Sequence, residues 1–181
     1  MKHLILIRHG QSEWNQQKRF TGWVDVALTD KGRAEAKKAG ELIKEKKIKL
    51  DSFYSSYQKR ANDTLKIVMK ELNEDENLIT KKWQLNERHY GELTGLNKED
   101  MKKKYGEEKI HQFRRSWDVK PGALDRKSPY HPLNIETYKD IPATDIPDTE
   151  SLKDTHKRVV DCYNELILKD LQNGRGVCVS A

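Results

Sequence analysis

Leu4-Ile5-Leu6-Ile7-Arg8-His9-Gly10-Gln11-Ser12-Glu13 is the stretch on which the prediction of the fold depends. Its four leading apolar residues have no polar break, which predicts a strand buried on both faces in the middle of a parallel sheet. The strand ends on Arg8, His9 and Gly10, and open α/β sheets bind ligands just beyond the carboxyl ends of their strands. The stretch therefore predicts an α/β fold with a ligand site at this edge of the sheet.

The residues after the strand have the chemistry of a phosphate site. Gly10 permits a sharp turn and a close approach of the backbone to a ligand. Ser12 can cap a short helix whose N-terminal amides would favour an anion. His9 is then either a ligand to the phosphate or the nucleophile, although a lone histidine after a strand is more typical of an ordinary loop. Arg8 beside it favours the functional reading.

Composition favours a single globular domain with anionic partners. The chain has 181 residues, with 35 Lys and Arg against 29 Asp and Glu, so its net charge is +6. Its lysines mostly alternate with glutamates at helical spacing, as in "KKAGELIKEKKIK", which indicates a solvated helix face rather than a nucleic-acid surface. Small phosphorylated metabolites are therefore the expected partners, and nucleic acid is not.

Cysteine usage and the N-terminus predict a soluble, cytoplasmic protein with no membrane partner. Cys162 and Cys178 show no metal-ligand spacing and need no disulfide, which suits a reducing compartment. Cys178 lies in the apolar run Val177–Val179 and is expected to be buried. The four-residue apolar run near the N-terminus is too short for a signal peptide or a membrane span.

The chain predicts alternating strands and helices. Arg60 lies in the first turn of a helix that follows a predicted strand, on the same rim of the sheet as Arg8. A basic side chain there opposes the helix dipole, which hints at ligand binding. Thr29 and Asn97 are predicted helix caps. The predicted strands are 4–7, 50–56, 78–83 (an edge) and 177–180. The predicted helices are 30–47, 58–73, 98–105, 107–117 and one that starts with residues 148–152 and runs to about 171. Residues 119–147 are predicted to be irregular.

The run "LIRHGQSEWNQQKRFTGWVD" from Leu6 to Asp25 resembles the opening of the 2,3-bisphosphoglycerate-dependent phosphoglycerate mutases, a family of the histidine phosphatase superfamily. Arg-His-Gly alone would indicate only the superfamily, whereas the longer run is far more specific. "LNERHYG", "FRRSWDV" and "TESL" follow in the order of the family. The resemblance implies a three-layer α/β/α fold with a mainly parallel central sheet, formed by one domain over residues 1–181. Residues 119–147 would cover its active site.

The resemblance also implies the reaction and its residues. The chain would interconvert 2-phosphoglycerate and 3-phosphoglycerate, with priming by 2,3-bisphosphoglycerate and no metal. His9 would form a phosphohistidine, Arg8 and Arg60 would hold the phosphoryl group, and Glu87 would give and take the proton. Glu87 taken alone would be more typical of a surface carboxylate. The implied substrate-binding residues are Ser12, Asn15, Thr21, Gly22, Tyr90, Lys98, Arg114 and Arg115, and the implied assembly is a homo-oligomer, either a dimer or a tetramer.

Two alternatives stay open. One is a histidine phosphatase for small phosphate esters, which needs His9, Arg60 and a proton donor but not Lys98, Arg114 or Arg115. The other is a catalytically impaired form that only binds phosphorylated ligands. It follows from the ending at Ala181, because the family continues there with His-Gly-Asn and its second catalytic histidine. The chain is accordingly expected to be incomplete at its C-terminus, with little mutase activity.

Overall fold

The computed structural model describes residues 3–181, which divide into two compact units. The first unit contains the described residues up to Glu13, together with Ala27–Asn86 and Val159–Ala181. The second contains Trp14–Val26 and Glu87–Arg158. A single domain over residues 1–181 stays a prediction.

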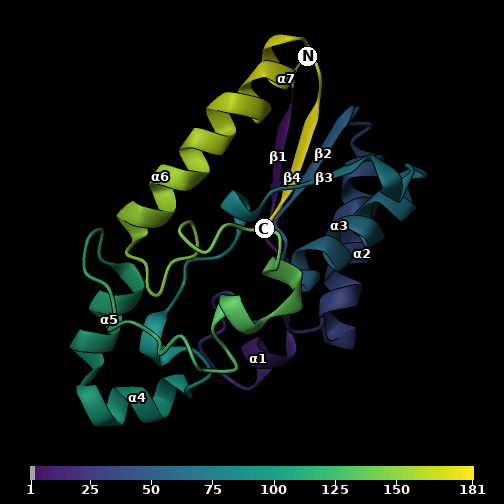
Figure 1. Cartoon of the computed structure of the whole chain (residues 1–181). Helices are drawn as coiled ribbons and strands as arrows, with labels where there is room; N and C mark the ends of the chain where they lie inside the picture. The colour runs from purple at the N-terminus through teal and green to yellow at the C-terminus, as the bar shows by residue number, and fades with distance from the viewer. Residues whose placement is uncertain (1–2) are drawn as a thin grey trace. The chain divides into compact units, whose positions relative to one another are not determined.

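The first unit is built on a four-stranded sheet in which every pair of neighbouring strands is parallel. The strands are β1 (Leu4–Ile7), β2 (Ser52–Ser55), β3 (Ile79–Lys81) and β4 (Val177–Ser180), in the order β1-β4-β2-β3 (Figure 1). Val177 pairs with Leu4 on one side and with Ser52 on the other, so the strands are in register. The carboxyl ends of β1, β2 and β4 therefore meet at one edge. The predicted α/β class and the predicted edge position of β3 are confirmed.

Helices cover both faces of this sheet, which confirms the three-layer prediction. On one face, α2 (Asp30–Glu45) and α3 (Lys59–Leu72) enclose a core that includes Phe53, Leu65 and Cys178 (Figure 1). On the other face, Val177 and Val179 pack against Cys162, Ile167 and their neighbours. These neighbours belong to the end of α6 (Leu152–Cys162), the π-helical turn η6 (Tyr163–Ile167) and α7 (Leu168–Gln172). The predicted continuous helix thus contains one wider turn.

The predicted position of the first strand is wrong. Among the described residues β1 has a neighbouring strand on one side only, β4, so it lies at an end of the sheet. Ile5 and Ile7 pack toward α2 and α3, but Leu4 and Leu6 are 37% and 72% exposed. An unbroken apolar run shows only that both faces are apolar, and it cannot show which face receives a covering element.

Helix boundaries follow local capping. The Thr29 side chain accepts a hydrogen bond from the Gly32 amide at 3.1 Å and caps α2. Asn97 accepts from the amides of Glu99 and Asp100 and caps α4 (Lys98–Tyr105). Both predicted caps are confirmed, since each satisfies an amide that has no partner inside its helix. The helix α5 (Glu107–Arg115) ends before the predicted Trp117 because Ser116 is extended.

The second unit has little regular structure beyond α4, α5 and the first part of α6. Two apolar clusters organise it, one around Phe20 and Leu93 and the other around Trp14 and Val24. Residues 119–147 are irregular, as predicted, apart from two short 3-10 turns. They are nevertheless well packed, and the Tyr138 hydroxyl donates to the Trp23 carbonyl. The short elements of this unit are η3 (Gly91–Leu93), η4 (Pro132–Asn134) and η5 (Glu136–Tyr138). The first unit has the short elements η1 (Glu76–Leu78) and η2 (Trp83–Leu85), and α1 (Glu13–Gln16) spans the boundary between the two ranges.

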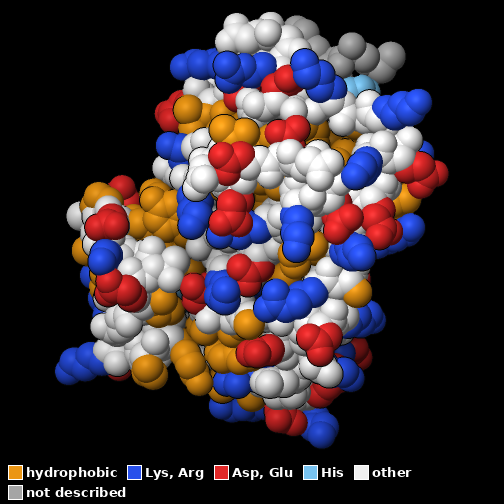
Figure 2. Space-filling model, turned by 90° about the vertical axis from the view of Figure 1, so that its right-hand side faces the viewer, with side chains coloured by type: hydrophobic (Ala, Val, Ile, Leu, Met, Phe, Trp, Pro, Cys, Tyr) orange, Lys and Arg blue, Asp and Glu red, His pale blue; other side chains and the backbone are white. Residues whose placement is uncertain are grey.

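Charges are interspersed on the face of the molecule in Figure 2, where Lys and Arg side chains alternate with Asp and Glu. On α3, Lys59 pairs with Asp63 at 2.9 Å one turn later. Both cysteines are free and buried, as predicted for Cys178, and burial raises the pKa of that thiol to about 12. Within residues 3–181, none of the helices has the length and apolar character needed to cross a membrane.

Candidate active site

His9 follows β1 directly, and its buried imidazole makes hydrogen bonds with both ring nitrogens. Its Nδ1 lies 2.7 Å from the carbonyl oxygen of Gly10, and a carbonyl only accepts, so Nδ1 carries the proton. Its Nε2 lies 3.2 Å from Nε of Arg60, and a guanidinium only donates. The two contacts are compatible only with a neutral imidazole whose lone pair is on Nε2, and that is the nucleophilic form of histidine.

Arg60 lies in the first turn of α3 and is fully buried. Thr64 connects this turn to the loop after β1, since its hydroxyl donates to the Arg60 carbonyl at 2.8 Å and accepts from the Gly10 amide at 3.0 Å. The structure thus brings His9 and Arg60 together, as the sequence predicts. The cation beside the histidine can stabilise negative charge that is transferred to Nε2.

Gly10 permits close packing between the loop after β1 and α2. A Cβ atom there would lie 2.2 Å from the carbonyl oxygen of Gly32. Gly10 is not among the glycines with positive φ, so its small size rather than its backbone conformation is what this contact requires. Its predicted approach to a ligand stays a prediction.

The other two predicted phosphate residues of the first unit differ in exposure. Arg8 is exposed at the end of β1, where its guanidinium is accessible to solvent. Ser12 is fully buried one residue before α1 and forms an antiparallel bridge with Leu28. The amide of Glu13, the first residue of α1, donates to the Ala27 carbonyl at 3.1 Å, so that amide does not point to an anion.

In the second unit, several predicted substrate residues gather around Tyr90. Gly22 has a φ of +56°, and a Cβ atom there would lie 3.2 Å from the Tyr90 amide nitrogen. Thr21, its neighbour, is buried. The Phe20 ring lies 5.2 Å from the Tyr90 ring, and Nζ of Lys98 lies 5.7 Å from the Phe20 centroid. Only glycine can bring the backbone so close to Tyr90 in this conformation.

Charged side chains surround the Tyr90 hydroxyl. Burial raises the pKa of Tyr90, the Glu87 carboxylate raises it further, and the cations of Arg88 and Arg114 lower it. Glu87 and Arg114 therefore lie close enough to Tyr90 to act on its charge. The remaining predicted residues are less enclosed, since Arg115 is exposed at the end of α5 and Asn15 is half-buried in α1.

Arg88 is a candidate that sequence reasoning missed. Its guanidinium lies 5.0 Å from the Tyr90 ring centroid, and the side chain is only 6% exposed. Its Nη1 atom has no hydrogen-bond partner among the residues that the structure describes. A buried guanidinium with a spare donor can bind an anion. The sequence feature that indicates Arg88 is its position within "LNERHYG", between the predicted site residues Glu87 and Tyr90.

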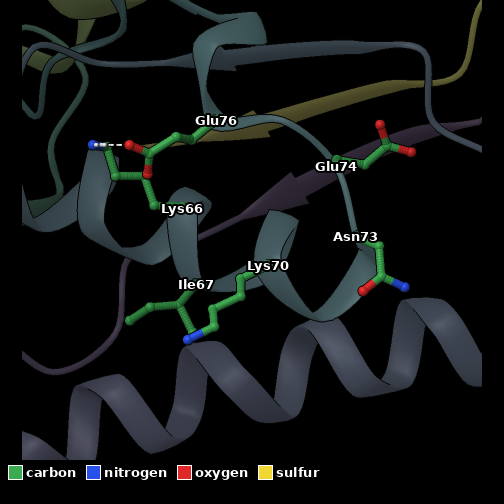
Figure 3. A pocket seen from close by; sticks show the side chains of 6 residues that line it. All are labelled: Lys66, Ile67, Lys70, Asn73, Glu74 and Glu76. Atoms are coloured by element: carbon green, nitrogen blue, oxygen red, sulfur yellow. Dashed lines mark hydrogen bonds and ion pairs between the residues drawn. The ribbon is translucent and has the colours of Figure 1, made fainter.

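A surface hollow at the end of α3 contains none of the predicted site residues. Figure 3 shows its six lining side chains, which carry both charges, and Lys66 pairs there with Glu76 at 3.3 Å. With cations and carboxylates mixed, this hollow does not suit an anionic ligand. The lining residues are Lys66, Ile67, Lys70, Asn73, Glu74 and Glu76.

Solved structures share the fold. A mycobacterial glucosyl-3-phosphoglycerate phosphatase superposes with a TM-score of 0.73 at 22% identity, over 100% of this chain and 76% of its own. A protein described as mycobacterial hydrolase 1 superposes with a TM-score of 0.71 at 21% identity, over 100% and 73%. At such identities the likeness concerns the fold alone.

Sequence relatives identify the family. Residues 4–131 match the family model of the histidine phosphatase superfamily, branch 1. The chain is 62% identical to a 2,3-bisphosphoglycerate-dependent phosphoglycerate mutase of Pelagibacter ubique (strain HTCC1062), over 100% of this chain and 76% of the relative. It is 48% identical to the protein of the same name from Borreliella burgdorferi (strain ZS7), over 100% and 73%. The chain therefore belongs to the 2,3-bisphosphoglycerate-dependent phosphoglycerate mutases, within branch 1 of the histidine phosphatase superfamily.

Proposed function

We propose that this protein interconverts 3-phosphoglycerate and 2-phosphoglycerate through a phosphorylated His9. The observation that carries the proposal is the hydrogen bond from Nε of the buried Arg60 to Nε2 of His9, at 3.2 Å, which requires a lone pair on Nε2. Phosphoryl transfer asks for a nucleophile and for cations on the transferred oxygens. This pair supplies both.

His9 takes its first phosphoryl group from 2,3-bisphosphoglycerate, when an Nε2–P bond forms and a P–O bond breaks. Protonated Glu87 gives its proton to the leaving oxygen, and monophosphoglycerate is released. The free hydroxyl of a bound monophosphoglycerate then attacks the phosphorus, which gives bound 2,3-bisphosphoglycerate and neutral His9. Glu87 receives the proton of that hydroxyl. When the other phosphoryl group returns to His9, Glu87 returns the proton to the leaving oxygen. Arg8 and Arg60 stabilise the charge on the transferred oxygens in each step.

The remaining candidates bind the parts of the substrate that do not react. Lys98, Arg114 and Arg115 supply cations for the carboxylate and the second phosphate, and Arg88 adds a fourth. The rest of the substrate-binding surface is polar and closely packed, and it is formed by Ser12, Asn15, Thr21, Gly22 and Tyr90. The arrangement of Gly22 against Tyr90 supports this part of the proposal. The absence of a metal from the reaction stays a prediction.

A histidine phosphatase is the second candidate, because the same fold occurs in a protein described as a phosphatase. Lys98, Arg114 and Arg115 favour the mutase, since a phosphatase needs only to bind the reacting phosphate. The test measures formation of 2-phosphoglycerate and release of inorganic phosphate from the same 3-phosphoglycerate solution, with catalytic 2,3-bisphosphoglycerate. We expect a mutase turnover that is low but exceeds phosphate release. It should disappear in His9→Ala but not in the surface control His111→Ala. Phosphate as the main product would reject the mutase assignment.

We also propose a cytoplasmic location and a homo-oligomeric state, either dimer or tetramer. The free, buried cysteines support the first. The resemblance to the family supports the second. Light scattering of the purified protein tests the oligomeric state, and a monomer at micromolar concentration would contradict it.

A further inference from the structure

We infer that Glu150 and Arg158 are positioning residues that hold the backbone of Glu87–Tyr90 for catalysis. The inference rests on the proposed function, because Glu87 is the proposed proton carrier. Neither Glu150 nor Arg158 is among the site residues that the sequence predicts. Both lie in the same compact unit as the segment that they hold.

The two side chains form a buried, bidentate ion pair. Arg158 Nε lies 2.6 Å from Oε1 of Glu150, and its Nη2 lies 2.8 Å from Oε2. Glu150 is 3% exposed and Arg158 is 9% exposed. The guanidinium also lies over the Trp23 ring at 5.5 Å, so one of its faces is covered as well. Such a fork fixes both the distance and the plane of the two groups.

The pair makes three contacts with the backbone of the segment. The carboxylate of Glu150 accepts from the His89 amide at 2.9 Å. The Glu150 amide donates to the His89 carbonyl at 3.0 Å. Arg158 Nη2 donates to the Glu87 carbonyl at 3.2 Å. Peptide groups on both sides of Arg88 are thus held, and so are the Cα positions from which Glu87 and Tyr90 extend.

The pair of Glu150 and Arg158, called the clamp below, is itself held by the residues that follow Glu150. The Ser151 hydroxyl accepts from the Asp154 amide at 3.1 Å, and the Asp154 carboxylate accepts from the Ser151 amide at 2.9 Å. This reciprocal cap fixes the first turn of α6 immediately after Glu150. Arg158 lies further along the same helix, so the capped start of α6 connects the two residues of the pair.

Stability alone is a poor explanation for this pair. Removing two charges from water is costly, and a buried ion pair often stabilises a fold no more than apolar residues of similar volume would. Here the pair also supplies two of the three hydrogen bonds to the segment. Catalysis requires the proton carrier to keep its orientation, and a displacement of about 1 Å can cost about a hundredfold in rate. Positioning accounts for the geometry.

The experiment compares Glu150→Gln, Glu150→Ala and Arg158→Lys with wild type in mutase turnover, well below each unfolding midpoint. We expect kcat to fall by roughly 10- to 100-fold while KM changes by less than about threefold, because three of the four proposed substrate cations, Lys98, Arg114 and Arg115, lie outside the held segment. Glu150→Gln, which keeps an acceptor for the His89 amide, should retain more activity than Glu150→Ala. The matched control is Arg126→Lys, since Arg126 forms a comparable two-bond pair with Asp148 in the same unit. It should leave kcat unchanged.

Hydrogen exchange of the His89 amide supplies a readout that does not depend on turnover. It should exchange faster in Arg158→Lys and Glu150→Ala than in wild type or Arg126→Lys. Unchanged exchange, or unchanged kcat in a folded Glu150→Ala protein, would overturn the clamp. A different pair of results would be faster exchange in the variants and no mutase turnover in the wild-type protein. These results would overturn the proposed function, and with it the catalytic purpose of the clamp.

Discussion

At the residue scale, the two kinds of cation have separable roles in the proposed reaction. Arg60 contacts the nucleophile, whereas Arg114 lies near Tyr90 among the proposed substrate residues. We expect Arg60→Ala to lower kcat by roughly 100- to 1000-fold, because its contact strengthens as charge develops in the transition state. Arg114→Ala should mainly raise KM. Steady-state kinetics in both directions measures the two effects.

Arg33→Ala is the control for these substitutions, because Arg33 is an exposed arginine on α2. Arg60 is fully buried, so Arg60→Lys and a circular dichroism spectrum of each variant are needed to separate a loss of chemistry from a loss of fold. An Arg60→Ala protein that is folded and shows only a raised KM would show that the role given to Arg60 is wrong.

His89 gives a second prediction at this scale, for stability against pH. Its pKa is lowered to about 3, mainly by burial; the nearby His131 and Arg158 also lower it, and Asp148 raises it. The unfolded chain binds the proton first, near the ordinary pKa of about 6.5. The contribution of His89 to stability is therefore complete above that pH, and it is lost as pH falls toward 3.

The expected size is a decrease in the free energy of unfolding of up to about 1.4 kcal/mol per pH unit between these limits. Urea unfolding at a series of pH values measures it, with His89→Gln as the comparison. In the wild-type protein the Gly91 amide donates a hydrogen bond to His89 Nδ1 at 2.9 Å. A glutamine side chain can still accept this hydrogen bond, but glutamine does not titrate. Equal slopes for the two proteins between pH 6 and 4 would contradict the prediction.

At the scale of elements, the loop after β1 and the start of α2 pack so closely that neither Gly10 nor Gly32 could carry a side chain without a shift of the backbone. Cβ atoms at Gly10 and Gly32 would lie 2.2 and 2.1 Å from backbone carbonyl oxygens. We expect Gly10→Ala to destabilise the protein by roughly 1–3 kcal/mol, because a main-chain shift must accommodate the methyl group. Gly40→Ala is the control, since the nearest atom there is Cβ of the Glu71 side chain. Thermal unfolding should show the smaller loss for Gly40→Ala.

Elements defined by local chemistry could be predicted from the sequence. Thr29 and Asn97 cap their helices because each side chain satisfies amides two or three residues away. The position of β1 could not be predicted, because an apolar run is compatible with an end or the middle of a sheet. Nor could the wide turn at Tyr163–Ile167, since apolar residues continue through it at helical spacing.

The site could be predicted in part for the same reason. Arg60 was found from its place at the start of a helix after a strand, a local pattern. The roles of Glu150 and Arg158 depend on partners 61 and 71 residues away along the chain, and no periodicity records such contacts. Whether the selected residues bind substrate stays a prediction.

At the scale of the whole molecule, the net charge of +6 and the cations of the proposed site should make folding sensitive to small anions. Binding to the folded state alone stabilises it by about 2.7 kcal/mol at a ligand concentration 100 times Kd. We expect 3-phosphoglycerate to raise the unfolding midpoint, with a smaller shift in Arg114→Ala and at high salt. Differential scanning fluorimetry measures this, with glycerol as the uncharged comparison. An equal shift with Arg114→Ala would argue against its role.

The contact between His9 Nδ1 and the Gly10 carbonyl also determines which chemical isomer the protein can form. Because Nδ1 is protonated and shielded by its own backbone, an incoming phosphorus atom can bond only to Nε2. The product is the 3-phospho isomer of histidine, never the 1-phospho isomer. After reaction with 2,3-bisphosphoglycerate, an antibody selective for 3-phosphohistidine should recognise the protein and one selective for 1-phosphohistidine should not. A single hydrogen bond within one loop thus gives the modification its regiochemistry.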